Sequence, residues 1–414
     1  MPKHWQRGAG KSGIYFVSLG LCMTAAMTAQ ESPKRPWYEL DTPWISAGLG
    51  FAAMEDGAFY SQDAESKQQV GDLSAEQLFR LDNLSISGEI KLCRPWRYTF
   101  AGNYRGLDTT VSRTWTSTDM NLSIPIGALG WVTLGKQKEG VGLEMMANAR
   151  DVDFMELSTM TTASSFFESH IVGVRFSGTA AGERMTWSAG WFNNWLDDDL
   201  SFSESGQIAA GRVTGTPVLA GGGRRLLHLG VSAVYREAPN GSLKSRSTPE
   251  VYEAPDFVDT GTFPADHAAS VGGELAAVEG PFTVSAEYTG THVSSPQTGN
   301  PDFSGFYVVA SWSLTGETRP YDRSSGTFGR ILPTAPFSFK HGGPGAWVLA
   351  ARYSNIDLTS GSIDGGQFER WGGALSWYPN RHWRFEFNYG YGRLERGGIV
   401  GRTDFYQLRL QFQL

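Results

Sequence analysis

Four arginines in the last part of the chain occupy equivalent positions in four alternating segments. Arg352, Arg370, Arg384 and Arg409 each stand on the polar side of a run in which apolar and polar residues alternate. A guanidinium presents a planar fork of N–H donors that suits the oxygens of phosphate and other oxyanions. Four such groups on one wall could therefore pass an anion from one side chain to the next.

The other basic candidates lie beside these four or in two connecting segments. Arg175 and Arg184 stand on the same alternation, whereas Lys136, Lys138 and Arg150 lie at the end of another alternating run or in the long connection that follows it. A second group, which could line an exit or simply be solvated, occupies one long segment: Arg319, Arg323, Arg330 and Lys340. The alternative role for any of these charges is an ion pair with an acid on the same face, such as Glu274, Glu287 or Glu386.

Alternation with a period of two is the feature that would position these charges. In the last segment Leu408 and Leu410 fall on one face, whereas Arg409 and Gln411 fall on the other. Such a segment is typical of a β-strand with one face suited to hydrocarbon and the other to water. The same pattern predicts sixteen strands, at 44–54, 78–91, 96–106, 115–124, 130–137, 168–177, 184–194, 206–217, 225–237, 269–277, 281–290, 304–314, 345–356, 368–378, 382–392 and 403–414.

Composition favours an all-β membrane protein. Glycine accounts for 51 of 414 residues and aromatic side chains for 13%. An even number of strands with rings at their ends, such as Trp377 and Trp383, is typical of bacterial outer-membrane barrels. We therefore predict an all-β fold, a 16-stranded antiparallel transmembrane β-barrel, with a soluble β-sandwich or propeller as the alternative. A helical membrane protein is excluded, because no run of 18 apolar residues follows the N-terminus.

The N-terminus has the composition of an export signal. Three basic residues, Lys3, Arg7 and Lys11, precede an apolar stretch that ends at Ala29, as in a secretory signal peptide. Cleavage is expected before Gln30, with a site after 24–26 as the alternative. We predict a signal peptide at 1–29, a periplasmic segment at 30–43 and the barrel at 44–414, in the bacterial outer membrane.

Three connections between predicted strands are long, at 138–167, 238–268 and 315–344. A chain that starts in the periplasm places the first two outside the cell and the third in the periplasm. Each could be a surface loop or a plug folded into the barrel. A sixteen-stranded barrel is too wide for its side chains to fill, so we expect an aqueous channel whose lining selects the solute.

Short motifs in the second half of the chain carry a family resemblance. The most specific are Leu314-Thr315-Gly316-Glu317 with Arg319 and Tyr321, Gly345-Ala346-Trp347, Ala351-Arg352-Tyr353-Ser354, Asp357-Leu358, Gly365-Gly366, Trp377-Tyr378-Pro379-Asn380, and Arg384 with Asn388-Tyr389. Weaker ones are Gly135-Lys136-Gln137-Lys138, Leu227-His228-Leu229-Gly230, Thr260-Gly261 and Glu287-Tyr288. Over about residues 75–414 the chain resembles the phosphate-selective porin O and P family of bacterial outer membranes.

The resemblance implies a homotrimer of sixteen-stranded porins in which the third loop, the fifth loop and one long periplasmic turn fold into the lumen. It also implies passive uptake of phosphate or polyphosphate along a narrow basic path. The chain departs from the family pattern in two places. Its third-loop segment, Val141 to Ser165, carries four acids against Arg150 alone, and the chain ends in Leu414 rather than in phenylalanine.

The predicted function is therefore passive diffusion of small anions, with phosphate or polyphosphate as the class implied by the resemblance. A general or cation-preferring porin of the same fold is the alternative, because the third loop is acidic and the formal charge falls from −7 to −10 if Lys3, Arg7 and Lys11 leave with the signal peptide. The expected partners are outer-membrane lipid, small anions and further copies of the chain. The mild acidity gives no case for binding to nucleic acid.

Chemistry other than transport has little support in the sequence. No nucleophile motif, cofactor motif or metal-binding helix is present, and two cysteines, Cys22 and Cys93, exclude a cysteine-rich metal site. His228 faces the lumen by alternation and is interpreted as a wall residue. An outer-membrane barrel hydrolase and an adhesive barrel without conductance stay as the more distant alternatives, so we predict no catalytic residues, no cofactor and no metal.

Overall fold

The computed structural model describes residues 36, 38–91, 95–105, 114–163, 169–193, 195, 201–202, 204–252, 254–340 and 342–414. The predicted signal peptide at 1–29 and Cys93 lie outside these residues. Residues 38–414 pack as one unit.

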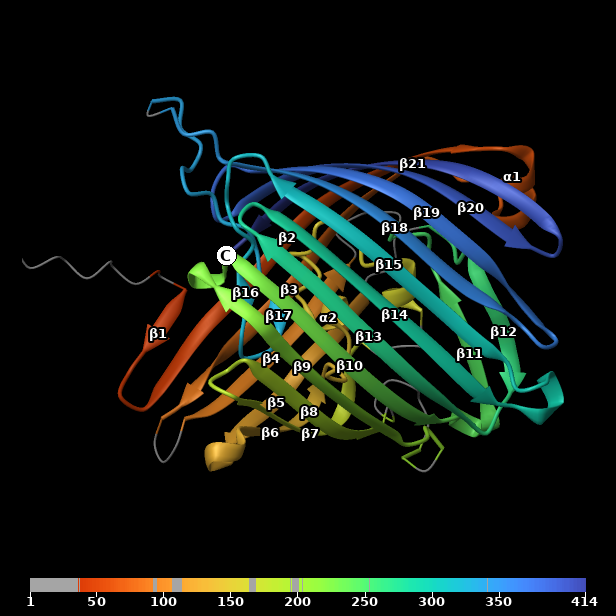
Figure 1. Cartoon of the computed structure of the whole chain (residues 1–414), viewed down its shortest axis with the longest axis horizontal. Helices are drawn as coiled ribbons and strands as arrows, with labels where there is room; N and C mark the ends of the chain where they lie inside the picture. The colour runs from red at the N-terminus through yellow and green to blue at the C-terminus, as the bar shows by residue number, and fades with distance from the viewer. Residues whose placement is uncertain are drawn as a thin grey trace, which may run out of the picture. The chain divides into compact units, whose positions relative to one another are not determined.

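Sixteen strands of the described chain close into one antiparallel barrel (Figure 1). In order around the barrel they are β2 (Ile45–Gln62), β3 (Glu76–Ile90), β4 (Trp96–Arg105), β5 (Thr114–Pro125), β6 (Trp131–Gln137), β7 (Ile171–Ala180), β8 (Met185–Asn193), β9 (Ile208–Ala220), β10 (Arg225–Glu237), β13 (His267–Glu279), β14 (Phe282–Ser294), β15 (Asp302–Ser313), β18 (Ala346–Ser360), β19 (Ile363–Tyr378), β20 (Trp383–Arg396) and β21 (Ile399–Gln413). β21 returns to pair with β2, with Asp56 opposite Arg409. Closure leaves no free edge of the sheet, as backbone in hydrocarbon requires. The predicted 16-stranded antiparallel β-barrel is confirmed.

Alternation along the strands separates the outer surface from the interior. In β21 Leu408 is 52% exposed and Leu410 is 38% exposed, whereas Arg409 and Gln411 are buried. Successive side chains of a strand point to opposite faces, so one register places Gln407, Arg409 and Gln411 of β21 inside. The outer face is left with the apolar side chains that lie stably in lipid.

The observed strand bounds differ from the predicted ones by a few residues at most ends. The largest difference is in β2, which continues to Gln62 although the alternation predicts an end at residue 54. The polar residues Glu55 and Asp56 and the following Gly57 interrupt the hydrophobic pattern there. The ladder from Ala52 to Gln62 with β21 extends the strand regardless, because pairing with a neighbour outweighs local propensity.

Short elements lie in the connections. They are β1 (Glu39–Asp41), α1 (Ala64–Val70), η1 (Gly127–Leu129), α2 (Leu143–Met146), α3 (Thr159–Thr162), η2 (Gly221–Gly223), η3 (Pro239–Gly241), β11 (Ser242–Ser247), β12 (Val258–Pro264), η4 (Pro296–Thr298), β16 (Tyr321–Asp322) and β17 (Thr327–Phe328). β1 pairs with β2, β11 with β12, and β16 with β17. Within the described part of the chain, no helix has the length and apolar character needed to cross a membrane.

Three long connections leave the barrel from its two ends. The third loop (138–170, between β6 and β7) and the fifth loop (238–266, between β10 and β13) leave from one end, and β11 and β12 of the fifth loop lie at the right of Figure 1. The long turn (314–345, between β15 and β18) leaves from the opposite end, because the number of strands that separates it from the two loops is odd.

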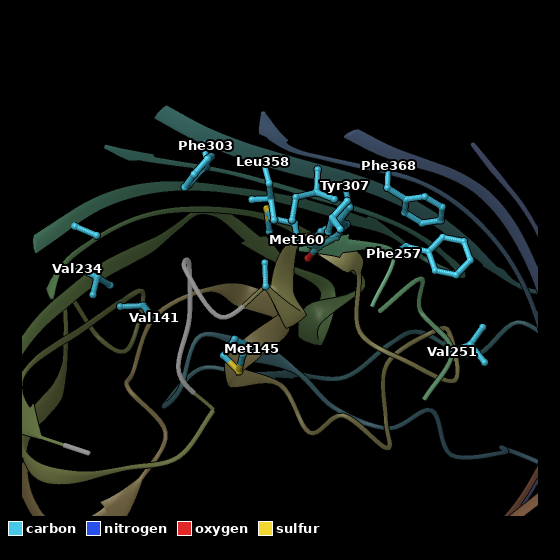
Figure 2. Close-up of a cluster of buried hydrophobic side chains, with 14 of the residues drawn as sticks. Val141, Met145, Met160, Val234, Val251, Phe257, Phe303, Tyr307, Leu358 and Phe368 are labelled. Atoms are coloured by element: carbon cyan, nitrogen blue, oxygen red, sulfur yellow. The ribbon is translucent and has the colours of Figure 1, made fainter. Parts of the chain in front are cut away.

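Apolar side chains of the loops pack inside the barrel. Met160 of the third loop and Phe257 of the fifth loop belong to one buried cluster with Leu358 of the wall (Figure 2). At Gly372 of β19 an added Cβ would lie 3.0 Å from the Phe154 ring, so the glycine allows the third loop to approach the wall closely. These contacts place both loops in the lumen, where they replace water against an apolar inner surface.

Candidate functional site

The third loop crosses the lumen, since it is hydrogen-bonded to strands on opposite sides of the barrel. Near its start, the Ser188 hydroxyl of β8 donates to the carbonyl of Gly140 at 2.9 Å. Further along, the Arg384 guanidinium of β20 donates to the carbonyls of Arg150 at 3.1 Å and Asp153 at 3.3 Å. β8 and β20 are eight strands apart in a ring of sixteen and so face each other. The loop therefore narrows the channel.

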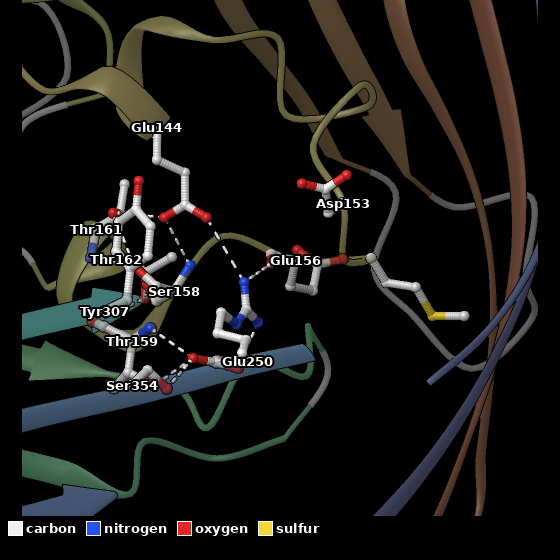
Figure 3. A network of polar contacts seen from close by, with 12 residues as sticks. Glu144, Asp153, Glu156, Ser158, Thr159, Thr161, Thr162, Glu250, Tyr307 and Ser354 are labelled. Atoms are coloured by element: carbon white, nitrogen blue, oxygen red, sulfur yellow. Dashed lines mark hydrogen bonds and ion pairs between the residues drawn. The ribbon is translucent and has the colours of Figure 1, made fainter. Parts of the chain in front are cut away.

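Glu144 of the third loop, Glu250 of the fifth loop and Ser354 of β18 lie in one polar network that joins both loops to the wall (Figure 3). Arg352 of β18 is part of this network. Its guanidinium pairs with the carboxylate of Glu250 and lies 3.5 Å from that of Glu144. It also donates to the Glu156 carbonyl at 3.0 Å, and its Cζ lies 4.2 Å from the centroid of the Phe154 ring. Buried charges are stable only when paired, and Arg352 is paired on several sides. Its position makes it an anchor.

Glu250 also connects the two loops directly. Its carboxylate accepts the backbone N–H of Thr159 at 3.1 Å and the hydroxyl of Ser354 on β18. Beside it, the hydroxyls of Thr162 and Ser247 lie 2.7 Å apart. The third loop, the fifth loop and β18 therefore share one hydrogen-bonded cluster. Loss of any member would leave buried polar groups of the other members without a hydrogen-bond partner.

Two further arginines of the wall hold the middle of the third loop. Arg409 of β21 pairs with Asp56 at 2.6 Å and with Glu156 at 2.7 Å, and it donates to the Met155 carbonyl. Arg80 of β3, which the sequence analysis did not single out, reaches the same Glu156 at 3.0 Å. The Glu156 carboxylate is thus neutralised from two strands.

The remaining arginines of the last four strands are also engaged. Arg370 of β19 donates to the Pro249 carbonyl of the fifth loop and to Gln407 at 2.9 Å. Arg384 pairs with Glu386 at 2.5 Å, in addition to its contacts with the third loop. All four arginines lie buried on one inner wall, as the alternation predicts, but their guanidiniums bind loop carbonyls and carboxylates. Ion pairing that holds the structure together describes them better than a free anion track.

On another part of the wall an acid holds the third loop. The Glu287 carboxylate of β14 accepts the backbone N–H groups of Leu143 and Glu144, both at 2.7 Å, and the hydroxyl of Tyr307 on β15. The first N–H groups of a helix have no partner within it, and Leu143 begins α2. Glu287 therefore fixes the start of the third loop by charge-assisted hydrogen bonds.

The long turn is attached to the wall by Arg212 of β9. Its guanidinium pairs with Glu274 of β13 at 2.7 Å and donates to the carbonyls of Ser325 and Gly326 at 2.9 and 3.0 Å. The same Glu274 lies 3.1 Å from Nε2 of His228. Arg212 stands on an alternating strand, so the alternation could have indicated that it points inward.

His228 is fully buried and lies between two partners. Its Nδ1 is 2.7 Å from the Tyr321 hydroxyl of the long turn, and its Nε2 faces Glu274. Both ring nitrogens are used in attaching the turn to the wall. This arrangement agrees with the interpretation of His228 as a wall residue.

The predicted basic residues of the long turn separate into different environments. Arg319 is buried, pairs with Asp153 and donates to the Asp151 carbonyl at 2.7 Å, so it joins the turn to the third loop. Arg323 is partly exposed and donates to the Glu183 carbonyl at 3.3 Å. Lys340 is exposed. Arg330 is buried.

Two other candidates lie at the ends of strands. Lys136 is buried near the end of β6, with Nζ 3.2 Å from the Ser117 hydroxyl. Arg184, which the alternation places inward, is exposed in the turn before β8 and donates to the carbonyls of Thr216 and Leu219. Alternation cannot predict the direction of Arg184, because the pleat stops where the turn begins.

Three predicted residues, Lys138, Arg150 and Arg175, form what we call the basic group. In the described part of the chain none of them makes an ion pair with a carboxylate. The Lys138 ammonium donates to the carbonyls of Met145 and Ala147 at 2.7 and 2.6 Å, and Arg175 donates to the Lys138 carbonyl at 3.3 Å. Burial and the positive charges of Arg150 and Arg175 lower the pKa of Lys138 to about 8, although the carboxylate of Asp119 opposes this shift.

Comparison with known families identifies the barrel. The family model described as phosphate-selective porin O and P matches residues 57–414. The chain belongs to that family. The resemblance seen in the short motifs is thereby confirmed, and the fold with its inward loops is that of an outer-membrane porin.

Individual relatives of this porin are distant. An uncharacterized protein of Caulobacter vibrioides is 31% identical over 275 residues, 63% of this chain and 53% of the relative. Porin O of Pseudomonas aeruginosa is 25% identical over 159 residues, 33% of this chain and 35% of the relative. The porin thus spans about half the length of the first relative and about a third of the second.

Solved structures share the fold of this porin. An anion-selective porin from Comamonas acidovorans has a TM-score of 0.57 at 11% identity, over 89% of this chain and 100% of that chain. A trimer form of OmpT, an outer membrane protein of Vibrio cholerae, has a TM-score of 0.54 at 11% identity, over 90% of this chain and 100% of that one. These likenesses show that the chain has the fold of an outer-membrane porin, in agreement with its family.

Proposed function

We propose that this porin conducts small anions, with phosphate or polyphosphate as the substrate class, after export of the chain with removal of residues 1–29. The observation that carries the proposal is the basic group, whose charges have no carboxylate partner in the described chain. Porin O belongs to the same family, and the Comamonas porin of similar fold is anion-selective; both relationships support the proposal.

The position of the basic group suits it to selection. Lys138 begins the third loop, Arg150 lies in the middle of it, and Arg175 stands on the adjacent strand β7. Charges at a constriction act strongly on a passing ion, because the surrounding low-dielectric wall focuses their field. Lysine offers a point charge and arginine a fork of donors, so a phosphate can exchange one partner for the next.

The acids of the third loop argue less strongly for a cation channel than their number suggests. Glu156 is paired with Arg80 and Arg409, Asp153 with Arg319, and Glu144 lies 3.5 Å from Arg352. An acid that is neutralised by a buried arginine adds little to the field in the lumen. This pairing favours anion conduction over the cation-preferring alternative.

Reversal potentials in a salt gradient test the proposal. The purified porin in a planar bilayer should give the sign of an anion-preferring current in potassium chloride, and added phosphate should block chloride current. The double variant Lys138→Met/Arg175→Gln should lower the anion-to-cation permeability ratio by about threefold to tenfold, as expected from charges a few ångströms from the ion. Arg225→Gln is the control, because Arg225 is exposed at the start of β10 and pairs with the exposed Glu279 at the end of β13. A cation-preferring current in the unmodified porin would refute anion selectivity.

The anion preference should also fall between about pH 7 and pH 9. The pKa of Lys138 is lowered to about 8, so its ammonium is charged below that pH and becomes neutral above it. Arginine side chains stay charged throughout this range, so the basic group loses one of three charges. The reversal potential recorded across these pH values measures the change. Lys138→Met should lack the step, and a step of equal size in that variant would assign it to another group.

We also propose that the porin assembles as a homotrimer through its wall of short strands. β6 has 7 residues and β8 has 9, whereas β19 has 16. Seven residues rise ~23 Å, and a tilt of about 40° reduces their height to ~18 Å, less than the ~25 Å apolar band of such barrels. A wall of this height is better covered by protein than by lipid. The trimer form of the Vibrio cholerae barrel supports the same assembly.

A further inference from the structure

Arg330 in the long turn is a buried guanidinium without acceptors for its donors. It is 8% exposed, and within the described residues Nε and both Nη atoms have no hydrogen-bond partner. The next residue, Ile331, packs in an apolar cluster with Ala346, Val348 and Tyr378. Arginine carries five N–H donors, and buried donors in native proteins are almost always satisfied. The acceptors at Arg330 must therefore come from outside the described protein.

Two other guanidiniums belong to the surroundings of Arg330. The Cζ atoms of Arg330 and Arg384 each lie 5.4 Å from the centroid of the Tyr378 ring. Arg384 donates to the Arg150 carbonyl at 3.1 Å, and the Nε atoms of Arg150 and Arg384 are buried and unbonded within the described chain. Burial, with the positive charges of Arg384 and Arg150, lowers the pKa of Arg330, whereas Tyr378 and Asp151 raise it.

Ion pairing within the protein does not balance these charges. Arg384 is paired with Glu386 and Arg319 with Asp153, whereas Arg150 and Arg330 make no ion pair within the described residues. The carboxylates of Asp151 and Asp82 act on Arg150 without pairing with it, and Asp151 acts on Arg330 in the same way. Water molecules could accept the N–H groups but would not offset the repulsion between the guanidiniums. A doubly charged oxyanion does both, because its oxygens accept several N–H groups and its charge matches theirs.

We propose that Arg330, Arg150 and the Nε edge of Arg384 bind one tetrahedral oxyanion, phosphate or sulfate, between the long turn and the third loop. The ion is held by residues of the turn, the loop and β20 together, so it fastens the turn to the loop. It is a resident ion and not one in transit. The site therefore does not require the channel to prefer anions, and it is distinct from the exchange of phosphate along the basic group, although Arg150 contributes to both.

Calorimetric titration of the full-length, folded porin in detergent tests the site, with inorganic phosphate as the probe and chloride at constant ionic strength as the background. The unmodified porin should bind phosphate saturably. Arg330→Gln should remove one phosphate site per chain or weaken it at least tenfold, whereas Lys138→Met should retain that site. Arg225→Gln, at the exposed start of β10, is the matched control and should bind as the unmodified porin does. Sulfate should compete for the same site.

The outcomes separate this proposal from the proposed function. Phosphate binding that is lost in Arg330→Gln supports the site even if bilayer recordings show no anion preference. Binding that is lost only in Lys138→Met, or no saturable binding at all, overturns the site, whatever the selectivity of the channel. If Arg330→Gln does not fold, as judged by its heat-modifiable mobility in gels, Arg330→Lys serves instead. It keeps the charge but loses the fork, so several-fold weaker binding supports the site and unchanged binding overturns it.

Discussion

Replacing Arg352 by methionine should open the channel, with a single-channel conductance that rises at least about twofold. Methionine keeps much of the stem but removes the closer of the two arginine partners of the buried Glu250, so that only Arg370, at 3.7 Å, remains. Breaking a buried ion pair on one side costs about 3–5 kcal/mol, and the two loops can avoid this cost by moving the carboxylates into the water of the lumen. The third and fifth loops would then leave β18. Conductance of the variant in planar bilayers, recorded in potassium chloride, measures the effect.

A double variant separates the anchoring role of Arg352 from a role in conduction. Arg352→Met/Glu250→Gln removes both charges of the pair, so no buried carboxylate is left uncompensated at Glu250. If Arg352 is an anchor, the double variant should have a conductance closer to that of the unmodified porin than the single variant has. If Arg352 instead attracts anions into the pore, both variants should lose anion current equally, and the Glu250 substitution should restore nothing.

The barrel could be predicted from the sequence because its signal is local and repeated. Each strand needs only a period of two, and a lipid-facing surface admits few polar residues, so the alternation in a segment such as 403–414 appears directly in the sequence. The same alternation places Arg352, Arg370, Arg384 and Arg409 on the inner wall, where the structure has them. The alternation did not predict the second half of β2, because the ladder there depends on pairing with β21, which lies at the far end of the chain.

The roles of the inward charges could not be predicted in the same way. Their partners Glu144, Glu156 and Glu250 lie in loops without periodic patterns, and contacts such as Arg352 with Glu250 join residues that are far apart in sequence. Which basic residues stay without a carboxylate therefore depends on how the loops fold. Lys138, Arg150 and Arg175 look the same in the sequence as the arginines that turn out to be anchors.

Replacing Glu287 by alanine should release the start of the third loop. The variant loses two charge-assisted hydrogen bonds from the N–H groups of Leu143 and Glu144, each worth about 1.5–3 kcal/mol. It also leaves those buried donors at the beginning of α2 without an acceptor. We expect trypsin to cut the folded barrel after Lys138 or Arg150 at least about tenfold faster than in the unmodified porin, as followed by mass spectrometry of the products.

Two opposing effects make the Glu287 substitution informative. Glu274 and Glu144 are acids close enough to repel the Glu287 carboxylate, so its removal relieves repulsion while it removes the hydrogen bonds. If repulsion dominates, Glu287→Ala should resist trypsin better than the unmodified porin, and the anchor assigned here would be wrong. Tyr307→Phe removes only the hydroxyl that donates to Glu287 and should change the cutting rate little.

Glu287 and Arg352 hold the same loop from different strands, so their effects on conductance should not be additive. The double variant Glu287→Ala/Arg352→Met should raise the conductance by less than the sum of the two single increases, because a loop freed at one anchor is already partly out of the channel.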